Sequence, residues 1–169
     1  MFHFFVLSVL LCSLLVMPQP ITAQARPNVP DGISSLKTIS VRLLPGQDLK
    51  TELDRLVQAY QIQAGVLLTG VGSLTDVSLR LANQDGATVH RGHFEIVSLV
   101  GTLSVNGSHL HLAVSDSTGR TTGGHLMPGN LIYTTAELVI GILPDVVYTR
   151  EPDPTFGYRE LVIRQKKRK

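Results

Sequence analysis

The sequence predicts an α+β domain in which a mostly antiparallel β-sheet packs with one main helix. About eight short segments are rich in β-branched and apolar residues and end at Gly, Pro, Asn or Asp, as strands do. Only residues 48–61 repeat their apolar side chains at helical spacing. Most connections are short, which favours antiparallel neighbours, because parallel strands need long crossovers.

Residues 1–25 predict a cleavable secretory signal peptide. Residues 4–16 form an almost unbroken apolar run, and Ala23-Gln24-Ala25 supplies the small-x-small pattern of a cleavage site. The leader has no Lys or Arg, but its apolar run is shorter than the roughly 20 residues of a membrane span. We therefore expect cleavage after Ala25, a secreted or periplasmic protein, and no membrane span in the mature chain.

Cysteine and charge narrow the chemistry further. The chain's one cysteine lies in the leader, so the mature protein has neither a disulfide nor a thiolate ligand. The chain has 15 basic and 13 acidic residues, but five of the basic ones lie in residues 164–169. The rest of the chain is therefore net negative. A basic tail is most often solvated, and less often contacts phosphate or anionic lipid.

The chain after the leader divides into three parts. Residues 26–37 predict a flexible N-terminal arm, since prolines, a glycine and serines gather there. Residues 38–164 form the folded domain, and residues 165–169 form the basic C-terminal tail. The sequence shows no internal repeat and no sign of a second folded domain.

The elements of the domain follow from local patterns. Residues 38–43 alternate as a strand and end at Pro45-Gly46. Asp48 is placed to cap the helix, whose apolar residues are Leu49, Leu53, Leu56 and Val57. Residues 115–124 predict a loop, and the last strand is expected to close the sheet. The remaining predicted strands are residues 64–68, 76–81, 87–91, 94–105, 108–114, 131–143, 146–149 and 158–164.

Glycines inside the strand region need their own explanation. Gly70-Val71-Gly72 is not a phosphate loop, because neither a helix nor a Lys-Ser/Thr pair follows it. We expect a tight bend or a close strand crossing there. Gly101 interrupts an apolar strand and predicts a bulge or kink.

Three histidines are the candidate metal ligands. His109 and His111 alternate with leucines, so both imidazoles point to one face of a strand, and His125 follows a Gly-Gly pair nearby. Three imidazoles can hold one divalent ion such as zinc and leave a fourth position for water. The alternative is structural: the pair bonds to backbone or subunit neighbours, and His125 only ends the loop.

Other polar residues allow several interpretations. Asp116 either bonds its own turn or orients a histidine. Glu95 and Glu137 lie in apolar strands, where they pair across a subunit contact, ligate a metal or face water. Ser115 beside Asp116 lacks a nucleophile elbow, so we expect no hydrolytic triad.

A series of motifs in order resembles the plant- and prokaryote-conserved (PPC) domain, over about residues 39–163. The resemblance implies a mostly antiparallel sheet with helix, assembled as a homotrimer, and a histidine stretch near the trimer contacts. It also implies a metal at His109, His111 and His125, as suspected in some prokaryotic relatives. The motifs are residues 92–103, His109-Leu110-His111, Ser115-Asp116, Gly119, Gly123-Gly124-His125-Leu126 and residues 135–140.

Plant members of this family bind DNA through an AT-hook, while their PPC domain assembles subunits and recruits partners. This sequence carries no such hook and has His93 where plant members have arginine. Its net negative body and its leader also weaken a nucleic-acid role, since affinity for DNA depends on neutralising phosphates.

We therefore expect an exported, homotrimeric binding module that coordinates a divalent metal through the three histidines. Its partners would be its own copies and an unidentified small molecule or protein. The alternatives are a DNA-binding protein of the PPC type and a metal-dependent hydrolase. The hydrolase would have metal ligands but no assigned general base, so we expect a binding module rather than an enzyme.

Overall fold

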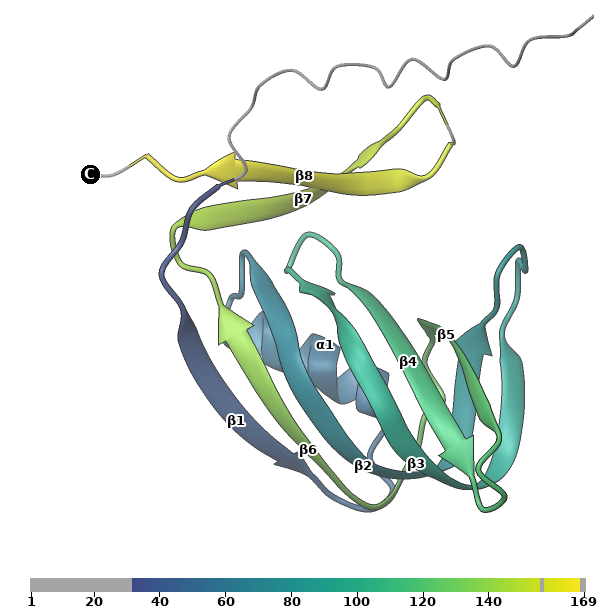
Figure 1. Cartoon of the computed structure of the whole chain (residues 1–169). Coiled ribbons are helices and arrows are strands. Elements are labelled where there is room, and N and C mark those ends of the chain that lie inside the picture. Colours follow the sequence, from purple (N-terminus) through teal and green to yellow (C-terminus); the bar gives the residue numbers. More distant parts are fainter. Residues whose placement is uncertain (1–31, 156, 168–169) are drawn as a thin grey trace, which may run out of the picture. The chain divides into compact units, whose positions relative to one another are not determined.

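The computed structural model describes residues 32–155 and 157–167 (Figure 1). The predicted signal peptide and the first residues of the predicted arm lie outside them. The elements are β1 (Lys37–Leu43), α1 (Leu49–Ala59), β2 (Gly65–Arg80), β3 (Thr88–Leu103), β4 (His109–Asp116), β5 (Thr121–Leu126), β6 (Ile132–Ile142), β7 (Val146–Pro152) and β8 (Arg159–Gln165). No helix among the described residues has the length and hydropathy that crossing a membrane requires.

The strands form two antiparallel sheets. Six strands lie in the order β1-β6-β2-β3-β4-β5, and the far end of β2 also pairs with β5. Strands β2 to β5 therefore make a closed ring of pairings at that end. Strands β7 and β8 form a separate hairpin (Figure 1). Among residues 32–155 and 157–167, the predicted mostly antiparallel sheet with one main helix is confirmed.

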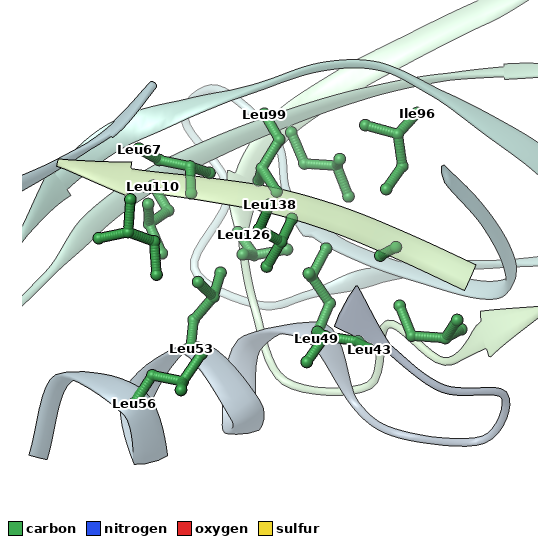
Figure 2. Packing of buried hydrophobic residues seen from close by; sticks show 14 of the residues in the cluster. Leu43, Leu49, Leu53, Leu56, Leu67, Ile96, Leu99, Leu110, Leu126 and Leu138 are labelled. Carbon is green, nitrogen blue, oxygen red and sulfur yellow. The ribbon is translucent and has the colours of Figure 1, made fainter. Parts of the chain in front are cut away.

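Helix α1 covers one face of the six-stranded sheet. Asp48 caps it, since its side chain accepts a hydrogen bond from the backbone N–H of Thr51 at 2.8 Å. The predicted apolar stripe is buried, and Figure 2 shows Leu49 and Leu53 facing the strand leucines Leu99 and Leu138. This single core fixes the orientation of the strands that carry the candidate site.

Two predicted strand breaks are absent, because β2 and β3 are each continuous. A side chain at Gly72 would place its Cβ 2.1 Å from the carbonyl oxygen of Thr135 on β6, so the expected close strand crossing is confirmed. Of the two alternatives predicted at Gly101, a bulge or a kink, the bulge is absent. The register there is regular, and the β3–β4 bulge lies between Ile96 and Ser98. Gly101 is needed because a Cβ would lie 2.0 Å from the carbonyl oxygen of His109.

Two further predictions are wrong. The loop predicted at residues 115–124 is a β-hairpin, whose second strand β5 pairs with both β4 and β2. Its Thr-Thr-Gly-Gly start has no apolar alternation, so only pairing reveals the strand. The last strand, β8, does not close the main sheet but pairs with β7.

The β7–β8 hairpin is joined to the main sheet by hydrogen bonds. The backbone N–H of Tyr148 donates to the carbonyl oxygen of Gln63 at 3.0 Å, and its own carbonyl accepts from Ser104 Oγ at 3.1 Å. Arg150 Nη2 donates to Thr102 Oγ1 on β3 at 2.9 Å. These bonds bring the hairpin to the edge of the histidine cluster.

Candidate metal centre

The structure brings the three predicted histidines together. His109 and His111 lie on the face of β4 opposite Leu110 and Leu112, which are buried. His125 is the cross-strand partner of His111 in the β4–β5 hairpin, so its side chain projects from the same face. One ring nitrogen from each lies within 4.8 Å of the other two.

The donor geometry fits a divalent ion. Zinc bonds imidazole nitrogen at about 2.0–2.1 Å, which in a tetrahedral site separates two nitrogens by about 3.3 Å. The Nε2 atoms of His109 and His111 are 3.1 Å apart, and a ring nitrogen of His125 lies within 4.8 Å of a ring nitrogen of each. The Nδ1 atom of His125 is buried and has no hydrogen-bond partner among the described residues. A buried nitrogen without a partner costs free energy, which a ligand at this position would remove.

The electrostatic surroundings keep two of the rings neutral. Burial, followed by the charges of Arg150 and His111, lowers the pKa of His109 below its ordinary value. Burial, followed by the charges of His109 and Arg80, lowers the pKa of His125 to about 4. A neutral imidazole has a free lone pair, so both side chains are in the protonation state that binds a metal.

A cavity of about 560 Å³ opens beside His109 and His125. A second hollow borders His109 and His111, and Arg150 and Glu160 line both spaces. Sequence reasoning missed these neighbours, because no motif surrounds them and they come from separate strands. The remaining residues of the first cavity are Arg80, Asn106, Gly107, Ser108, Tyr158 and Arg159.

The other polar candidates lie outside the cluster. Asp116 is the last residue of β4, at the end of the strand away from His109. Its Oδ1 accepts hydrogen bonds from Thr118 N, Thr118 Oγ1 and Arg120 N at 2.7–3.0 Å. It therefore bonds its own turn, which was one of its two expected roles. Glu95 and Glu137 are exposed on the single chain, as the water-facing interpretation requires.

Comparison with known proteins identifies the family. The model of the Plants and Prokaryotes Conserved (PCC) domain, the PPC domain of the sequence resemblance, matches residues 31–144. The chain belongs to this family. The matched residues include the three histidines but end before the β7–β8 hairpin.

Two curated relatives share half of the aligned residues. They are the bifunctional protein GlmU of Synechococcus sp. strains JA-2-3B'a(2-13) and JA-3-3Ab, each 50% identical, over 82% and 83% of this chain. The chain spans only 22% of the length of either relative. The similarity therefore concerns one part of those proteins.

Solved structures have the same fold. A hypothetical protein from Salmonella cholerae-suis is 46% identical, with a TM-score of 0.79, and the match covers 80% of this chain and 99% of that one. A protein from Archaeoglobus fulgidus described as metal-containing is 19% identical, with a TM-score of 0.63 over 80% of this chain and 99% of that one. At that identity the second likeness concerns the fold alone.

Proposed function

We propose that this protein is an exported PPC-domain module that assembles as a homotrimer and binds a divalent metal ion such as zinc. His109, His111 and His125 would hold the ion. The observation that carries the metal site is the convergence of three imidazole nitrogens within 4.8 Å, with a buried His125 nitrogen lacking a partner among the described residues.

The three histidines would leave one coordination position open toward the cavity. A zinc ion held by these nitrogens would polarise an oxygen ligand bound beside them. The chain's own contribution is to hold the rings on two paired strands, where the backbone ladder limits their movement. Such a centre suits binding of an oxygen-containing ligand.

Metal analysis of the purified protein tests this site. Under metal-replete conditions we expect about one ion per chain in the wild type and none in the His109→Ala/His111→Ala double variant. His93→Ala is the matched control, because His93 is an exposed histidine on β3 whose ring packs on Tyr133. A wild-type protein without bound ion would contradict the proposal.

A metal-dependent hydrolase is the second candidate function, and one observation favours it. Glu160 is a carboxylate that lines both spaces beside His109, where a general base would accept a proton from a metal-bound water. Ester substrates test it: Glu160→Gln should abolish turnover while the metal content stays unchanged. Absence of turnover by the metal-loaded wild type would contradict the hydrolase and favour the binding module.

The trimer is supported by the apolar face that α1 does not cover. Val71, Val97 and Val100 on the central strands β2 and β3 are 50–59% exposed on the single chain. Grouped apolar side chains of this kind mark contact surfaces, and the family resemblance implies contacts among three copies. Sedimentation equilibrium should give three times the chain mass for the wild type and a lower mass for Val97→Lys. Val89→Lys, at a similarly exposed valine further along β3, is the control.

Export is supported by the pattern of residues 1–25, which lie outside the described residues. The intact mass of protein recovered from an exporting host should correspond to a chain that begins at Arg26. A recovered chain that retains the leader would contradict cleavage.

A further inference from the structure

The cavity beside the histidine cluster gathers positive charge. Arg80, Arg150 and Arg159 all line it, although they come from three different strands, β2, β7 and β8. Among the described residues that line it, Glu160 is the one carboxylate. This concentration contrasts with the net negative charge of the chain before its basic tail.

Strand pairing places these arginines around the imidazoles. Arg80 is the cross-strand partner of His125, so both side chains project from one face of the sheet. Thr102 is the cross-strand partner of His109, and its Oγ1 accepts the hydrogen bond from Arg150 Nη2 at 2.9 Å. Arg159 Nη2 in turn donates to the backbone carbonyl oxygen of Arg150 at 2.5 Å. Arg80 therefore lies beyond His125 and Arg150 beyond His109, and all three arginines line the one cavity beside the histidine cluster.

The arginines lack anionic partners of their own. The ion pairs among the described residues use Lys50, Arg55, Arg91 and Arg164, and none uses an arginine of the cavity. The Nε atom of Arg150 is buried without a hydrogen-bond partner in the described part of the chain. A buried N–H group without an acceptor is costly, and an oxyanion that accepts from it removes that cost.

We propose that this cavity binds a small organic molecule through its phosphate group. The inference rests on the metal centre proposed above, because one phosphate oxygen would occupy the open metal position while the others accept from the arginines. A phosphate dianion matches three guanidinium groups better than a single carboxylate does. The volume of about 560 Å³ is typical of small-molecule sites and leaves room for the organic part near Asn106 and Tyr158.

The β7–β8 hairpin supplies two of the three arginines, yet it lies beyond residues 31–144 that the family model matches. The proposed metal ligands lie within the residues that the family model matches, whereas two of the three arginines of the proposed phosphate site lie beyond them.

Cobalt(II) substitution separates the two proposals in one experiment, because its visible spectrum reports the metal centre directly. We expect glycerol phosphate and inorganic phosphate to change this spectrum and to bind by calorimetry. Arg80→Gln and Arg159→Gln should bind cobalt as the wild type does but bind phosphate on the order of 10–100-fold more weakly. Arg120→Gln is the matched control, since Arg120 lies at the other end of the β4–β5 hairpin and should behave as wild type.

Each outcome has a distinct meaning. No cobalt spectrum overturns the metal centre and this inference with it. A cobalt spectrum with no phosphate response, or with equal phosphate affinity in the arginine variants, overturns the phosphate site alone. Tighter binding of succinate than of glycerol phosphate overturns the phosphate class. Arginine-dependent binding of an AT-rich duplex, with no binding of the small phosphates, overturns the small-molecule assignment in favour of nucleic acid.

Discussion

The two ends of the β4–β5 hairpin differ in how their polar groups are satisfied. At the turn, the Asp116 carboxylate accepts three hydrogen bonds from its own loop. At the open end, His109 and His111 contact mainly each other, and His125 has a buried nitrogen without a partner among the described residues. The polar groups of the turn satisfy one another, whereas the open end has ring nitrogens available to bind a ligand.

Both ends depend on the same buried face. Leu110, Leu112 and Val114 alternate with the polar residues of β4 and are at most 1% exposed. Packing of these residues in the core therefore fixes β4, and the histidines on its opposite face are free to bind a ligand. Four substitution experiments test this separation.

The largest effect should come from Leu112→Ala in the metal-free protein. Removing this buried side chain should lower the free energy of unfolding by about 2–5 kcal/mol, because it leaves a cavity under the hairpin. His111→Ala, on the exposed face, should change it by no more than ~0.5 kcal/mol. Urea unfolding measures both, and equal losses would contradict a division between the two faces.

His125→Ala should have the next largest effect, on metal affinity. Removing a residue that only supports a metal ligand weakens metal binding by ~10–100-fold. Removing the ligand His125 itself should weaken metal binding by more than that. Competition with a chromophoric chelator measures the affinity. Asp116→Ala is the paired control, and a similar loss in that variant would show that the two ends are coupled.

Asp116→Ala should have a smaller effect, confined to stability. The turn loses its acceptor for Thr118 and Arg120, so the Tm should fall while metal affinity is retained. Differential scanning calorimetry measures the change. Asp116→Asn should restore part of it, because an amide oxygen can accept the same bonds.

The smallest effect should be the pH dependence of the stability that the Asp116 carboxylate contributes. The Thr118 hydroxyl, followed by the backbone of Thr118, lowers the pKa of Asp116 below its ordinary 3.8. A lowered carboxyl pKa stabilises the fold above pH 3.8, and this stabilisation is lost as the pH falls through the folded-state pKa. The Tm difference between wild type and Asp116→Ala should therefore be constant near neutrality and shrink below pH 3.8. A constant difference down to pH 2.5 would contradict the assigned hydrogen bonds.

Local patterns were enough to predict several features of this protein. Helical spacing and a cap at Asp48 predicted α1, and strict alternation placed His109 and His111 on one face of a strand. Asp116 was expected at its turn because the residues that bond it follow directly in sequence. In each case the deciding interactions lie within a few residues, so the sequence carries them.

Tertiary structure decided the rest. Thr121 begins a strand despite its glycine neighbours, and only the β4–β5 register sets His125 opposite His111. The docking of the β7–β8 hairpin, and the placement of Arg80 and Arg150 around one cavity, follow from contacts between residues far apart in the chain. Pairing and register depend on such long-range contacts, which no local period records. The sequence by itself determined that His109 and His111 share one face of a strand, and the tertiary structure decided that His125 lies beside them.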